Sequence, residues 1–150
     1  EVNNLGIGVL VNWLSGNEET VEALKNATDK EIASVQLQKN PDRDKYDIDK
    51  LVLKFTDGTG LRFWDDGQSC CEYRYMVCDD EKEFPSYVGA KFLKAELVYS
   101  KPIEGQYGDM HEIQFLNIVT TKGVIQCATH NEHNGYYGGF YIKVDSKIGE

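Results

Sequence analysis

The stretch KLVLKFTDGTGLRFW, residues 50–64, decides the fold of this chain. Its first half alternates with a period of two, which is typical of a β-strand. Asp57-Gly58 is a strong signal for a tight turn, and Asp65-Asp66-Gly67 ends the returning segment. The stretch therefore predicts an antiparallel hairpin.

Similar short segments follow along the chain. We expect a short helix over residues 20–27 and strands over 31–38, 70–77, 91–99, 112–121, 124–129 and 139–144. Polar loops are expected over residues 40–44, 79–83 and 100–109. This pattern predicts a β-rich α+β fold, an antiparallel sheet or partial barrel with one short N-terminal helix. The 150 residues suit a single domain, with residues 1–30 as an N-terminal extension and residues 31–145 as the β-rich core.

The charge balance limits the partners. The chain has 16 Lys and Arg residues against 25 Asp and Glu residues, a net charge of -9. A negative field opposes a nucleic-acid backbone, so no direct nucleic-acid binding is expected. It suits solubility, a basic protein partner or mimicry of a polyanion. The carboxylates are concentrated in two runs, Asp42, Asp44, Asp47 and Asp49 in one and residues 79–83 in the other, which form solvated faces or imitate DNA phosphates.

The cysteines and apolar runs bear on location. The four cysteines do not form a convincing disulfide framework, because a vicinal disulfide is strained and a chain of this length can fold without disulfides. They are Cys70, Cys71, Cys78 and Cys127. The apolar run over residues 7–14 is too short to span a bilayer, and no signal sequence opens the chain. We therefore expect reduced thiols, a cytoplasmic location in a bacterial cell and no membrane partner.

Two short motifs mark a candidate binding surface. They are Cys-Cys-Glu at residues 70–72 and Asn-Gly-Tyr-Tyr-Gly-Gly at residues 134–139. Adjacent cysteines on a strand face opposite sides, so both cannot enter one core. The glycines allow close backbone approach around two amphipathic rings. The candidate ligand- or partner-binding residues are Cys70, Cys71, Glu72, His130, His133, Asn134, Gly135, Tyr136 and Tyr137.

Metal and thiol chemistry remain alternatives. His130 and His133 are three residues apart, which could place both imidazoles on one side of a turn. The chain has no Cys-x-x-Cys pair, so no cofactor is expected and zinc is the alternative. A zinc- or thiol-dependent hydrolase would use Cys71 and Glu72 with either histidine. The residues with zinc-binding side chains are Cys70, Cys71, Cys127, His111, His130 and His133, with Glu72 and Asp109 in reserve.

Several words occur together in an order that resembles a known family. They are Cys-Cys-Glu at residues 70–72, Val88-Gly89, Thr-Thr-Lys-Gly at residues 120–123 and Asn-Gly-Tyr-Tyr at residues 134–137. Together with the hairpin that starts at residue 50, they resemble a family of small proteins of unknown function from bacteriophages and bacteria. The resemblance implies a phage or prophage setting and no assigned chemistry.

These observations favour binding over catalysis. We expect a non-enzymatic, acidic phage-type protein that inhibits or sequesters a host defence component, such as a CRISPR or restriction nuclease. The first alternative is capture of a small nucleotide-like ligand between the Cys-Cys-Glu and Asn-Gly-Tyr-Tyr words. The second alternative is the hydrolase. The partner is thus a basic host protein or a small ligand, and the oligomeric state stays open.

Overall fold

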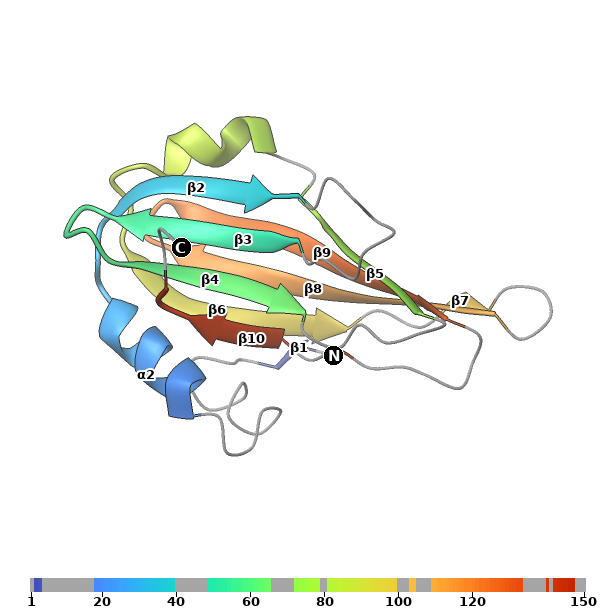
Figure 1. Cartoon of the computed structure of the whole chain (residues 1–150). Helices are drawn as coiled ribbons and strands as arrows, with labels where there is room; N and C mark the ends of the chain where they lie inside the picture. The colour runs from blue at the N-terminus through green and yellow to red at the C-terminus, as the bar shows by residue number, and fades with distance from the viewer. Residues whose placement is uncertain are drawn as a thin grey trace.

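Two antiparallel β-sheets face each other in the computed structural model, which describes residues 2–3, 18–39, 49–65, 72–78, 81–99, 103–104, 109–133, 140 and 142–147 (Figure 1). The large sheet has the order β1 (Val2–Asn3), β6 (Phe92–Tyr99), β8 (Met110–Thr120), β9 (Gly123–His133) and β5 (Glu72–Val77), and β7 (Ile103–Glu104) pairs with β8. The small sheet has the order β10 (Ile142–Asp145), β4 (Gly60–Asp65), β3 (Lys50–Phe55) and β2 (Ile32–Gln38). The helices are α2 (Glu18–Ala27) and the 3-10 helix η1 (Glu81–Tyr87).

The predicted hairpin is confirmed as β3 and β4, in which Leu53 pairs with Leu61. Gly58 in the turn has a φ of 89°, a backbone conformation that glycine adopts without steric cost. The amide of Thr59 donates to Asp57 Oδ1 at 2.9 Å, and its hydroxyl donates to the same oxygen at 2.5 Å. These two bonds, with Lys30 beside them, lower the pKa of Asp57 to about 2. The local sequence thus fixes this turn through its own hydrogen bonds.

Apolar side chains from both sheets and from α2 fill the space between the layers. Alternation along the strands directs every second residue inward, and most of the buried residues are inward ones, although Val52 is buried on the outer face of β3. Phe63 and Leu116 are fully buried on the small and large sheets, respectively. The core includes Leu24, Ile32, Leu51, Leu53, Phe55, Leu61, Phe63, Phe92, Leu97, Leu116, Ile118, Ile125, Ile142 and Val144.

The fold class is confirmed in its coarse form and corrected in its arrangement. A β-rich antiparallel fold with a short helix over residues 20–27 is found, but the chain is mostly all-β rather than α+β. The expected arrangement in a single sheet is wrong, because the strands form two antiparallel sheets, and the described pairings close neither of them into a barrel. Hairpins predict which strands are neighbours, whereas the crossings from β4 to β5 and from β9 to β10 leave no periodic signal.

Several boundaries differ from the sequence prediction, and β7 lies within the loop expected over residues 100–109. Residues 81–83 were expected in a loop but begin η1, in which Phe84 is buried. The strand expected over residues 124–129 continues to His133 as β9, because β5 and β8 pair with it along its length. None of the helices in the described ranges is long and apolar enough to cross a membrane.

Candidate functional site

The inner face of the large sheet changes from apolar to polar along its strands. Leu116 and Cys127 pair on its apolar part, and the next inward pair toward the polar part is Gln114 with Thr129. Here β5, β8 and β9 continue past the end of the small sheet (Figure 1). We call this surface the polar end, and it comprises Glu72, Arg74, Glu112, Gln114, Thr129, Asn131 and His133.

A buried ion-pair network joins the two sheets at the polar end. Arg74 Nη1 on β5 donates to Asp65 Oδ2 at the end of β4, at 2.8 Å. Arg74 Nη2 donates to Glu72 Oε2, to which Asn131 Nδ2 also donates at 3.1 Å. The side chains of Arg74, Asp65 and Glu72 are 4%, 5% and 3% exposed. Two carboxylates therefore share one guanidinium away from water, where the loss of one partner is costly.

The histidines lie on two faces of the large sheet. His133 is buried at the polar end, and its Nε2 lies 2.7 Å from Glu112 Oε1. His130 stacks on Tyr75 with ring centroids 4.6 Å apart, and its Nδ1 lies 2.8 Å from His111 Nε2. The prediction that His130 and His133 share one side is wrong, because residues three apart on a strand face opposite sides.

Two buried side chains at the polar end lack partners. Gln114 is fully buried, and neither its Nε2 nor its Oε1 has a hydrogen-bond partner in the described part of the chain. Thr129, its register partner, is 1% exposed, and its Oγ1 also lacks a partner there. A buried polar group without a partner costs about 1–3 kcal/mol, so native proteins satisfy most such groups with protein, water or ligand. One amide donor, one amide acceptor and a hydroxyl that can donate or accept thus lie at paired positions on the inner face of β8 and β9.

Strand pairing relates the two motifs singled out in the sequence, Cys-Cys-Glu and Asn-Gly-Tyr-Tyr-Gly-Gly. Glu72, the last residue of the Cys-Cys-Glu motif, pairs with His133, which directly precedes Asn134 in the sequence. Asp65 pairs with Ile142, so the connections 66–71 and 134–141 start and finish at adjacent positions. The predicted site residues Cys70, Cys71, Asn134, Gly135, Tyr136 and Tyr137 lie outside the described residues.

A family model for a domain of unknown function, DUF7448, matches residues 25–142. The chain belongs to this family. No curated protein and no solved structure matches the chain. The DUF7448 match runs from the end of α2 to the first residue of β10, so it includes the polar end and both connections. The predicted resemblance to a family of unknown function is confirmed at that level, and the phage setting stays a prediction.

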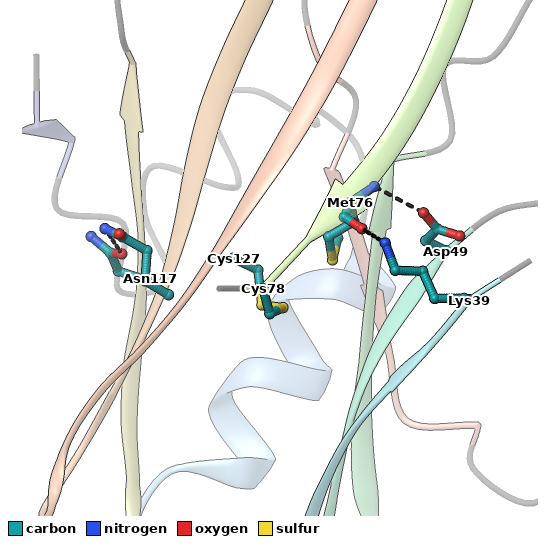
Figure 2. Close-up of a disulfide and its surroundings, with 7 residues drawn as sticks. Lys39, Asp49, Met76, Cys78, Asn117 and Cys127 are labelled. Carbon is teal, nitrogen blue, oxygen red and sulfur yellow. Dashed lines mark hydrogen bonds between the residues drawn. A yellow bond between two sulfur atoms is a disulfide. The ribbon is translucent and has the colours of Figure 1, made fainter. Parts of the chain in front are cut away.

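The cysteines of this DUF7448 member are not all reduced. Cys78 and Cys127 form a disulfide between β5 and β9, with Cα atoms 4.2 Å apart (Figure 2). The expectation of reduced thiols is therefore wrong for Cys78 and Cys127, as is the zinc-ligand role of Cys127, whereas Cys70 and Cys71 lie outside the described residues. Spacing could not show this pairing, because the two cysteines are 49 residues apart and only the register of β5 on β9 brings them together.

One predicted acidic residue is structural. Asp49 was counted in an acidic surface run, but it is buried and accepts a hydrogen bond from the amide of Met76 at 2.9 Å (Figure 2). Lys39 Nζ donates to the carbonyl of Met76 at 2.6 Å, so both residues hold β5 in place. Asp49 therefore contributes no exposed charge.

The described side chains hold no large metal-ligand cluster. Within the described ranges, no group of three or more His, Cys, Asp or Glu side chains is placed to hold a metal ion. Glu72, which the hydrolase alternative would use, is bound to Arg74 and Asn131. The polar end can instead offer neutral hydrogen-bonding groups beside a fixed ionic network. Neither Gln114 nor Thr129 was singled out in the sequence, and only their inward alternation on β8 and β9 could have suggested them.

Proposed function

We propose that the protein is a non-enzymatic binding protein that holds a small polar molecule at the polar end. The observation that carries this proposal is the buried amide of Gln114 beside the buried hydroxyl of Thr129, neither of which has a hydrogen-bond partner among the residues that the structure describes. A ligand that presents both a donor and an acceptor, such as an amide or the edge of a nucleobase, would satisfy these groups. The connections that carry the Cys-Cys-Glu and Asn-Gly-Tyr-Tyr words begin beside this place.

The charge of the polar end favours a neutral ligand group over a phosphate. Asp65 and Glu72 both bind Arg74, so the guanidinium is already matched by two carboxylates. A phosphate there would be repelled by the second carboxylate. For a nucleotide-like ligand, the base would lie at the polar end and the phosphate would lie away from it.

Native mass spectrometry of the freshly purified protein tests the proposal. We expect extra mass from one small organic molecule, which is lost in Gln114→Leu. That variant should remain folded, because replacing a partnerless buried amide with an apolar group is neutral or stabilising. Gln126→Leu is the matched control, because Gln126 is exposed on the other face of β9 and binds Asn117. A bare polypeptide mass, or a ligand retained by Gln114→Leu, would contradict the proposal.

A second proposal rests on the net charge of -9. It assigns the protein a basic host partner, such as a CRISPR or restriction nuclease, in a phage-infected bacterial cell. Exposed carboxylates at Glu81 and Glu83, together with Tyr136 and Tyr137, would contact that partner. Inhibition of a purified nuclease, weakened by Glu81→Gln with Glu83→Gln, would support it. Inhibition unchanged by these substitutions and by loss of both tyrosines would contradict it.

The cytoplasmic location belongs to this second proposal. A disulfide such as that of Cys78 is more typical of oxidising compartments than of the cytoplasm. Alkylation of thiols in intact cells, followed by mass measurement, tests the location directly. A fully reduced protein in cells supports a cytoplasmic location, and an intact disulfide argues against it.

A further inference from the structure

The outer face of the small sheet concentrates positive charge on an acidic protein. Lys50 and Lys54 point outward from β3, because the residues between and beside them on the inner face are buried. Arg62 on β4 and Lys143 on β10 share this face. Among the outward side chains that the structure describes on these strands, these four are basic and Asp145 is acidic.

Trp64 lies at one end of this positive face, near the end of β4. Lys143 is its register partner on β10. On the β3 side, Lys50 Nζ lies 5.3 Å from the centroid of the Trp64 ring. Arg62, two residues before Trp64 on β4, has its guanidinium carbon 5.6 Å from the same centroid. The ring is partly exposed. An accessible indole surrounded by cations offers a stacking platform beside groups that bind anions.

Asp145, the register partner of Arg62 on β10, holds the Arg62 guanidinium in position. Arg62 Nε and Nη2 donate to the two carboxylate oxygens of Asp145, each at 2.7 Å. Burial alone would raise the pKa of Asp145, but the hydrogen bonds from Arg62 and from the amide of Lys147 lower it overall. This bidentate pair fixes the guanidinium near Trp64, whereas the ammonium group of a lysine, on its flexible stem, can follow the position of an anion.

We propose that this face binds single-stranded nucleic acid, with Trp64 stacking on a base and Lys50 and Lys143 contacting the phosphates on either side. An aromatic ring on a flat sheet can stack on a base only when that base is unpaired, which excludes a regular duplex. The two lysines stand on the strands that flank β4, so their backbones are about 10 Å apart. Their long side chains extend the contact along the strand.

The net charge of -9 does not oppose this assignment. Salt screens exposed charges over about 8–10 Å, so a phosphate on this face is governed mainly by the nearest side chains. The expectation of no direct nucleic-acid binding rested on the sum of charges, whereas binding depends on their distribution over the faces. The face lies on the side of the small sheet opposite the polar end, so this proposal is independent of the proposed ligand there.

Trp64 supplies a direct spectroscopic test in the full chain. The chain has two tryptophans, so Trp13→Phe leaves Trp64 as the single one. In that background we expect an oligothymidylate to quench the fluorescence of Trp64 at low salt, with affinity falling as salt rises. Lys50→Gln with Lys143→Gln should reduce the slope of log affinity against log salt by about 1.4, since each single-strand phosphate contact contributes about 0.7.

Substitution of the ring measures the stacking contact. Trp64→Leu should weaken binding between about 5-fold and about 150-fold, and Trp64→Phe should weaken it less. These variants are followed by anisotropy of a labelled oligothymidylate, with circular dichroism to confirm folding. Lys82→Gln, which changes an exposed lysine on η1, is the matched control and should bind as the parent does.

Three outcomes would overturn the proposal. They are absence of binding at low salt, equal weakening by Lys82→Gln and by the paired lysine substitutions, and binding of polyglutamate as tight as that of oligothymidylate. The last would identify the face as a site for an acidic protein. If Trp64→Leu does not fold, a Trp64→Phe variant with unchanged affinity would equally refute stacking.

Discussion

Arg74 should be the most sensitive charged residue in the fold. In Arg74→Met, the carboxylates of Asp65 and Glu72 would remain buried without the guanidinium that binds them at present. Breaking a buried ion pair by removing one partner costs about 3–5 kcal/mol. With a urea m-value of about 2 kcal/mol/M, the unfolding midpoint should fall by about 1.5–2.5 M. Urea unfolding followed by tryptophan fluorescence measures this shift.

Two further variants isolate the cause. Lys30→Met breaks an exposed pair with Asp57, so it should cost less than about 1 kcal/mol. Adding Asp65→Asn and Glu72→Gln to Arg74→Met removes the stranded charges and should recover most of the lost stability. The reasoning fails if Arg74→Met is no more costly than Lys30→Met, or if the triple variant is as unstable as the single one.

Loss of the disulfide, either by reduction or in the double variant Cys78→Ala with Cys127→Ala, should destabilise the fold by about 4 kcal/mol, because the disulfide closes a loop of about 50 residues. An unchanged unfolding midpoint in urea would contradict this prediction. Gly58→Ala should cost about 1–2 kcal/mol because of the positive φ, and thermal unfolding with a parent control tests it. The carboxyl of Asp57 should titrate by NMR near pH 2 rather than 3.8. Its depressed pKa means that its stabilising contribution is present above pH 4 and lost as the pH falls toward 2; a normal midpoint would exclude the hydrogen bonds from Thr59.

Local sequence predicted those parts of the fold that local interactions determine. The turn at Gly58 follows from its own residue types, and strand alternation identified most of the sheet. The division into two sheets depends on where β5 and β10 pair, which involves residues distant in sequence. The same limit explains the missed disulfide, because the pairing of Cys78 with Cys127 follows from register and not from spacing.

The candidate site was predictable only at its ends. Glu72 and His133 were singled out by sequence, and their pairing on β5 and β9 places them together. His130 was assigned to the same side because its segment was interpreted as a turn rather than as strand. Gln114 and Thr129 carry no motif, and their importance comes from burial without partners, which a sequence does not display.

The distribution of charge over the faces bears on partners in a way that the net charge does not show. Asp49 and Asp65 add to the net charge, yet both are buried and bound within the protein, so neither contributes an exposed acidic surface. Lys50 and Lys143, in contrast, flank an accessible ring on one face. A buried carboxylate acts on the stability of the fold, whereas a partly exposed lysine can contact a partner, although the net charge counts them equally. Register and burial therefore determine how each face interacts with an anion. Measuring oligothymidylate binding in variants that change only the outer face of the small sheet separates its contribution from that of the other faces.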